Sequence, residues 1–179
     1  MRKIDSRQLL TERAALFEER LGKRGEYHAG RIPFPAVRFD CALAFHSRRS
    51  LLSVSHFLSL QGSMPTPSLN KEGPARCYLN RLGLWRMRGK NPRIRNIMQG
   101  LKGDATLGSQ LRKTDIDSMD IFLGDGCIDL SINLYGGGFS AVMLPPMHLP
   151  IGIPPHQAEE AARLYLIAMK RINACNPTG

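Results

Sequence analysis

The sequence contains no run of about 18 apolar residues, the length that a helix needs to cross a bilayer, so we expect no transmembrane segment. The first twenty residues carry Lys and Arg but no apolar core, so we expect no secretory signal there. The four cysteines at positions 41, 77, 127 and 175 lie far apart, without the spacing of a disulfide framework. These absences predict a cytoplasmic protein with reduced thiols and disfavour a disulfide-bonded secreted protein.

Motifs of familiar active sites are also missing. There is no G-x-S-x-G sequence, no cysteine stands beside a histidine, and the five histidines lack the H-x-x-x-H spacing of a metal site. No zinc finger, recognition helix or aromatic ribonucleoprotein motif is present. The sequence therefore favours a binding protein over an enzyme, and it predicts no cofactor.

Length and composition fit a single domain that spans residues 1–179. An apolar fraction of 42% in 179 residues can fill a sizeable core. The one candidate break is the segment 61–74, which holds three prolines and two glycines and which we predict to be an internal loop. The strands and helix predicted before it cannot bury a core alone, so we expect both halves to share one sheet.

The clearest structural signal is a hairpin over residues 119–135. From 127 to 135 apolar and polar residues alternate strictly, which indicates a strand with one buried and one wet face. A second alternating run, 119–123, precedes it, and Gly124-Asp125-Gly126 supplies a tight turn. We expect residues 136–138, three glycines, to reverse the chain into a third strand over 139–144, forming a meander. A phosphate-cradling role for these glycines is disfavoured, because they lead into a strand.

Other elements follow from the same periodicities. Helices are predicted over residues 5–24, from Pro92 to about 101, over 105–113 and over 156–173. Strands are predicted over 37–46 and 51–60 with a turn at 47–50, and a short hairpin over 76–88. The prolines of segment 147–155 exclude a central strand there. We therefore predict an α+β fold: an antiparallel sheet of five to seven strands with the N- and C-terminal helices packed on one face.

The charge is large and unevenly distributed. The net charge is +10, and the segment 76–113 contains ten Lys and Arg residues against one acid. The next segment, 114–160, contains seven acids and no Lys or Arg. A strongly basic protein favours an anionic partner. The sequence thus places a cationic block directly before an anionic one.

The basic block is the main candidate site. Its cations interleave with two aromatic residues, a composition typical of nucleic-acid surfaces, where Arg and Lys neutralise phosphates and aromatic rings stack on bases. The predicted anion-binding residues are Arg76, Arg81, Arg86, Arg88, Lys90, Arg93, Arg95, Tyr78 and Trp85. Nucleic acid is the first partner, and another phosphorylated ligand or an anionic membrane surface has the same chemistry. Three ordinary explanations compete: a solvated face, aromatics in the core, or pairing of the block with the acidic segment.

Two alternative functions remain open. The aspartates Asp115, Asp117 and Asp120 could hold a divalent metal in a small enzyme, because hard cations bind converging carboxylate oxygens. This signal is weak, since aspartate is common in turns and on wet faces, and a regular strand places 115 and 117 on one face and 120 on the other. The second alternative is a protein-interaction subunit without catalytic activity, including one that forms a homo-oligomer.

Overall fold

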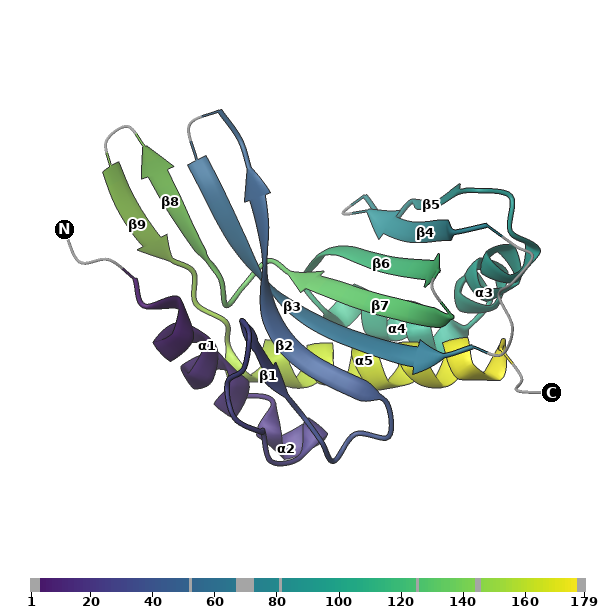
Figure 1. Ribbon diagram of the computed structural model, residues 1–179, viewed down its shortest axis with the longest axis horizontal. Coiled ribbons are helices and arrows are strands. Elements are labelled where there is room, and N and C mark those ends of the chain that lie inside the picture. Colours follow the sequence, from purple (N-terminus) through teal and green to yellow (C-terminus); the bar gives the residue numbers. More distant parts are fainter. Residues whose placement is uncertain are drawn as a thin grey trace.

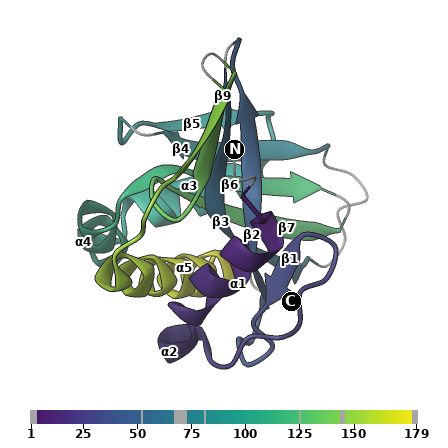
Figure 2. The same cartoon turned by 90° about the vertical axis from the view of Figure 1, so that its left-hand side faces the viewer.

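The computed structural model describes residues 4–51, 53–66, 73–80, 82–124, 126–143 and 146–176. Among these residues, nine strands form one open antiparallel sheet and five helices pack against a single face of it (Figure 1). A view turned by 90° shows the helices together on one side of the strands (Figure 2). The predicted α+β class, with terminal helices on one face, is confirmed.

Three of the helices begin at side-chain caps. Asp5 Oδ1 accepts hydrogen bonds from Arg7 N and Gln8 N, and Asn91 and Asp104 cap in the same way the helices that begin at Pro92 and Ala105. The helices are α1 (Ser6–Ala15), α2 (Glu18–Leu21), α3 (Pro92–Lys102), α4 (Ala105–Lys113) and α5 (Pro155–Ala174). The predictions for the last three are confirmed. The single helix predicted over 5–24 is instead divided into α1 and α2.

The sheet has more strands than the five to seven that we predicted. The strands are β1 (Arg31–Pro33), β2 (Asp40–Arg49), β3 (Ser53–Pro65), β4 (Ala75–Asn80), β5 (Trp85–Arg88), β6 (Ile116–Gly124), β7 (Cys127–Leu134), β8 (Phe139–Met143) and β9 (Pro146–Pro150). Their order is β1-β2-β3-β7-β6-β4-β5, and β8 pairs with β3 and β9. The extra strands β1 and β9 lie at edges of the sheet and contain proline, and the edge position of β9 agrees with the exclusion of a central strand from residues 147–155.

The predicted hairpin of β6 and β7 is confirmed, and it lies in the interior of the sheet between β3 and β4. Gly124 pairs with Cys127, and Ile121 pairs with Leu130. Ile128, Leu130 and Ile132 are at most 1% exposed because they face the helices. Alternation therefore leaves the polar side chains of both strands on the face without helices.

The predicted meander is wrong at its third strand. β8 does not pair with β7; it pairs with residues 53–56 of β3, while β7 pairs with residues 59–65 of the same edge. The glycines 136–138 therefore shift the chain sideways and do not reverse it. Gly138 makes this shift possible, because a Cβ at that position would overlap the carbonyl oxygen of His56.

The strand β3 corrects two further boundaries. It runs from Ser53 to Pro65, so residues 61–65 belong to a strand and not to the loop predicted over 61–74. Residues 67–72 of that loop lie outside the described part of the chain. The turn predicted at 47–50 also begins later, because β2 continues to Arg49. Cross-strand pairing over ten positions of β2 overrides the turn composition of this serine- and arginine-rich segment.

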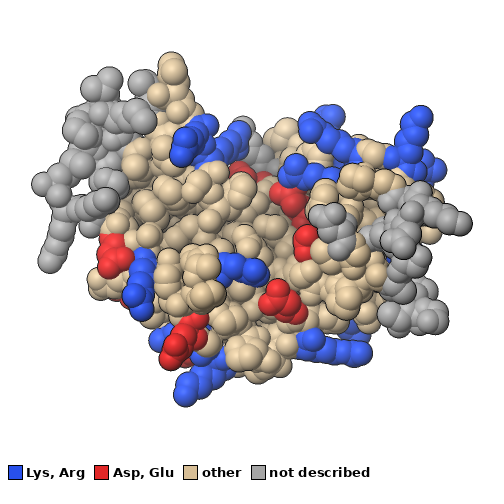
Figure 3. Space-filling view, in the orientation of Figure 1, with Lys and Arg blue, Asp and Glu red and all other residues tan. Residues whose placement is uncertain are grey.

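The helix-free face is curved. The far ends of β2 and β3 stand on one side of it, and β4 and β5 face them from the other (Figure 1). In the space-filling view, Lys and Arg side chains gather over both of these flanks, with acidic side chains between them (Figure 3). This face therefore has cationic borders and an acidic centre.

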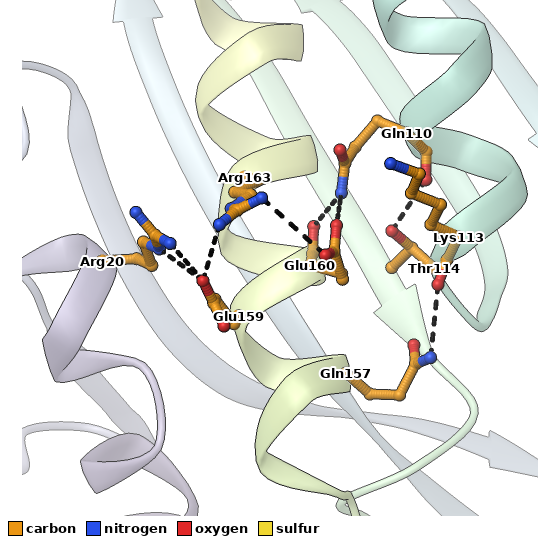
Figure 4. Close-up of polar contacts among 8 residues, drawn as sticks. All are labelled: Arg20, Gln110, Lys113, Thr114, Gln157, Glu159, Glu160 and Arg163. Atoms are coloured by element: carbon orange, nitrogen blue, oxygen red, sulfur yellow. Dashed lines mark hydrogen bonds and ion pairs between the residues drawn. The ribbon is translucent and has the colours of Figure 1, made fainter.

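The helix α5 is held against its neighbours by polar contacts as well as by its buried stripe (Figure 4). Arg20 of α2 donates to Glu159 Oε1 through Nε at 2.9 Å. Gln110 of α4 donates to the carbonyl oxygen of Glu160 at 3.0 Å, and Gln157 donates to the carbonyl oxygen of Lys113 at 3.2 Å. These contacts fix α2 and α4 to α5, beneath the sheet and away from its open face.

Candidate anion-binding cleft

Rows of paired side chains cross the helix-free face. The strand registers align Arg88, Arg76, Phe122, Asp129 and Ser63 in one row, then Arg86, Tyr78, Asp120, Ser131 and Gln61, then Asn80, Ser118, Asn133 and Ser59. Phe122, which is 40% exposed, is the one apolar side chain in these rows. The open face is therefore a polar surface built from five adjacent strands.

A cleft of about 470 Å³ opens on this surface where the sheet curves. Its volume lies within the roughly 300–1,000 Å³ typical of small-molecule sites. It is lined by His46, Arg48, Phe57, Arg76, Tyr78, Asn80, Leu82, Arg88, Asp117, Ser118, Asp120 and Asn133. The lining comes from the strands β2 to β7 and the β4–β5 turn, so segments distant in sequence meet here.

Three arginines line the cleft, and they differ in what they contact. The guanidinium of Arg76 pairs with Asp120, with Nε at 3.0 Å from Oδ1, and lies 5.3 Å from the ring centroid of Tyr78. Arg48 and Arg88 are both exposed, and within the described part of the chain neither guanidinium group has a hydrogen bond or an ion pair. Two guanidinium groups are thus available to an anion.

The structure brings only part of the predicted anion-binding set together. Arg76, Tyr78 and Arg88 line the cleft, and Arg86 lies on the same face, paired in register with Tyr78. The other members lie elsewhere: Trp85 on the opposite face of β5, Lys90 after β5, Arg93 and Arg95 on α3. Arg81 lies outside the described residues. Trp85 is partly buried against the core, which agrees with the ordinary explanation that the aromatics of the block belong to the core.

Sequence reasoning missed the opposite wall of the cleft. His46 and Phe57 come from β2 and β3, which overlap the strands predicted over 37–46 and 51–60, whereas Arg48 comes from the segment predicted as a turn. The cross-strand pair His46–Phe57 places these residues on the open face. The curvature of the sheet then brings this wall opposite β4, and no local sequence pattern encodes that approach.

The aspartates are also rearranged relative to the prediction. Asp117 and Asp120 both line the cleft, although a regular strand would place them on opposite faces. The register of β6 with β7 shifts between Ile116 and Ser118, and this bulge turns Asp117 toward the open face. Asp115 lies elsewhere, with its backbone N–H donating to Gln157 at 3.0 Å. Within the described residues, no group of three or more His, Cys, Asp or Glu side chains is arranged to hold a metal ion.

A short polar network crosses the floor of the cleft. Asn133 Nδ2 donates to Ser118 Oγ at 2.9 Å, and Ser118 Oγ donates to Asp120 Oδ2 at 3.5 Å. Asn133 is 4% exposed, and its amide oxygen has no hydrogen-bond partner among the described residues. A buried acceptor without a partner costs free energy, so a hydrogen-bond donor that reached this oxygen would lower that cost.

Comparison with known proteins identifies the family of the chain but assigns it no activity. Over the described residues, no helix is both long and apolar enough to cross a membrane. No curated protein and no solved structure matches the chain. A family model with the description "Protein of unknown function (DUF3156)" matches residues 17–170, a range that includes every residue lining the cleft. The chain therefore belongs to the DUF3156 family.

Proposed function

We propose that the cleft on the open sheet face binds single-stranded nucleic acid. The observation that carries the proposal is the convergence of Arg48, Arg76 and Arg88 on one cleft from strands on opposite walls. Guanidinium groups bind phosphate oxygens through paired N–H donors, and Arg48 and Arg88 have no competing partner in the described residues. Arginines on both walls can contact successive phosphates of one strand.

Aromatic side chains in the same cleft favour an unpaired strand over a duplex. Tyr78 and Phe57 line the cleft, each partly exposed, beside the arginines. Unpaired bases can stack on such rings, whereas the bases of a duplex are stacked on one another and present their backbone. A concave cleft of about 470 Å³ can also accommodate single nucleotides, whereas the convex surface of a double helix does not fit into it.

The ordinary explanation, that the acidic segment neutralises the basic block, accounts for one of the three arginines. Arg76 of β4 pairs with Asp120 of β6, but the guanidinium groups of Arg48 and Arg88 form no ion pair with an acidic residue in the described structure. The overall charge of +10 would further raise the local concentration of a polyanion. Both features support an anionic partner.

Fluorescence anisotropy with a nuclease-treated protein and a labelled oligonucleotide of about 12 residues tests the proposal. For single strands, the slope of log affinity against log salt is about −0.7 per phosphate contacted, so three arginines predict a slope of about −2. The affinity should then fall about 20-fold between about 50 and 200 mM salt. Absence of binding at low salt, or binding that does not vary with salt, would refute the proposal.

A pair of variants separates the cleft from the basic block as a whole. Combining Arg48→Ala with Arg88→Ala should make the salt slope shallower by about 1.4, because two phosphate contacts are lost. The matched control is Arg95→Ala, an exposed arginine on α3 in the basic block but outside the cleft. It should leave the slope unchanged. Equal effects of the two changes would show that general charge, and not the cleft, binds the strand.

A second candidate is a divalent-metal-dependent enzyme, which the shared position of Asp117 and Asp120 in the arginine-lined cleft favours. Mg²⁺ is commonly held by one or two carboxylates together with the phosphates of a substrate. A thermal shift with Mg²⁺ or Mn²⁺, with and without a nucleotide, distinguishes this candidate. An unchanged melting temperature at millimolar metal, both with and without the nucleotide, would exclude the metal-dependent enzyme.

A further inference from the structure

The floor of the cleft presents hydrogen-bond acceptors on Asp117, Asp120 and Asn133. We infer that it recognises bases that carry an amino group, so that it prefers cytosine to uracil. This inference rests on the proposed binding of single-stranded nucleic acid and specifies which base edge the cleft accepts. Cytosine and uracil differ at ring position 4, where cytosine has an NH₂ donor and uracil has a carbonyl acceptor.

The direction of the floor network follows from counting its protons. The single hydroxyl proton of Ser118 points to the carboxylate Oδ2 of Asp120, because a carboxylate can only accept. Ser118 Oγ must therefore accept from Asn133, which places the NH₂ of that amide toward Ser118 at 2.9 Å. The amide oxygen of Asn133 then points away from Ser118 and is left without a partner in the described residues.

Asp117 adds a second acceptor. The bulge in β6 turns it into the cleft, and in the described part of the chain its carboxylate has no hydrogen bond or ion pair. Asn80 offers a ligand its NH₂ and no acceptor, because its Oδ1 already accepts from the backbone N–H groups of Leu82 and Leu84, both at 3.0 Å. A ligand group that reaches the floor therefore meets a free carboxylate and an amide oxygen that lacks a donor.

An amino group satisfies these acceptors, and a carbonyl oxygen does not. The NH₂ of cytosine can donate to the carboxylate of Asp117. The carbonyl of uracil would face a carboxylate and leave both acceptors unpaired, which disfavours it. The phosphates of either nucleotide would still bind the arginines, so base preference and backbone affinity are separable.

The test compares oligodeoxycytidine and oligodeoxyuridine of equal length at one salt concentration. Deoxyuridine is used because it lacks the methyl group of thymidine. We expect oligodeoxycytidine to bind about tenfold more tightly, the usual discrimination from one good hydrogen-bonded base contact. Equal affinity, or tighter binding of oligodeoxyuridine, overturns the base preference while the proposed function stands. Failure of both strands to bind overturns both.

The variant Asp117→Asn tests whether Asp117 is responsible. It keeps the side-chain shape but replaces an acceptor oxygen with a donor NH₂. We expect the preference for cytosine to fall at least severalfold, with little loss of oligodeoxyuridine affinity. Arg95→Ala should leave the ratio of the two affinities unchanged. An Asp117→Asn protein with wild-type urea stability and an unchanged ratio would overturn the assignment of Asp117.

Discussion

The replacement Gly62→Ala should test how closely α5 is packed against the sheet. Gly62 lies on the helix-facing side of β3, directly opposite Tyr165 of α5. A Cβ at residue 62 would overlap the hydroxyl of Tyr165 and would lie 2.8 Å from both its Cζ and the carbonyl oxygen of Asp40. Because Tyr165 is fully buried and donates to that same carbonyl at 3.2 Å, its ring has little room to move.

The expected loss of stability is the balance of three effects. Overpacking of a core typically costs about 1–3 kcal/mol. Displacing the Tyr165 hydroxyl from Asp40 weakens a hydrogen bond worth about 1 kcal/mol. Replacing a strand glycine with alanine returns about 0.5–1 kcal/mol, because the unfolded chain loses freedom. The free energy of unfolding should therefore fall by about 2 kcal/mol.

Urea denaturation followed by circular dichroism measures this change. With a slope of about 2 kcal/mol per molar urea, the midpoint should fall by about 1 M. Gly152→Ala is the control, since a Cβ there meets no atom within 4 Å. Adding Tyr165→Phe to Gly62→Ala should recover part of the loss, because it removes the overlapping hydroxyl. Wild-type stability of Gly62→Ala would refute the close seating of α5 on β3.

Two further stability predictions follow from local chemistry. Asn91→Ala should lower the free energy of unfolding by about 1 kcal/mol in the same urea assay, because Asn91 Oδ1 caps α3. Burial raises the pKa of the Cys77 thiol from an ordinary value near 9 to about 12. Between these two pH values the thiol of Cys77 is deprotonated in the unfolded state and protonated in the folded state. Rising pH therefore favours unfolding, and the free energy of unfolding should fall by about 1.4 kcal/mol per pH unit over this range. Unfolding measured from pH 8 to 11 should show a shallower decline for Cys77→Val; parallel declines would contradict the assignment.

Local periodicity and capping predicted much of the fold. Strict alternation from residue 127 identified β7 and its buried face, and Asn91-Pro92 marked the start of α3. The pairing of β8 could not be predicted in the same way. Three glycines are compatible with a reversal or with a sideways shift, and the choice depends on the contact of Gly138 with the distant His56.

The candidate site was predicted less completely than the fold. Arg76 and Tyr78 share a face through alternation along one strand, which the sequence shows directly, and the register of the hairpin adds Arg88. Arg48 belongs to the same cleft only because β2 extends further than its composition indicates and because the sheet curves. Asp117 joins it through a bulge that breaks the alternation. Both depend on long-range pairing, which local patterns do not specify.

The most direct test of the central claim is to locate a bound strand on the protein. Ultraviolet cross-linking of oligodeoxycytidine, followed by mass spectrometry of the peptides, should yield adducts at the cleft aromatics Tyr78 or Phe57. Adducts at Trp85, on the other face of the sheet, or on α3, with none at the cleft, would contradict the account.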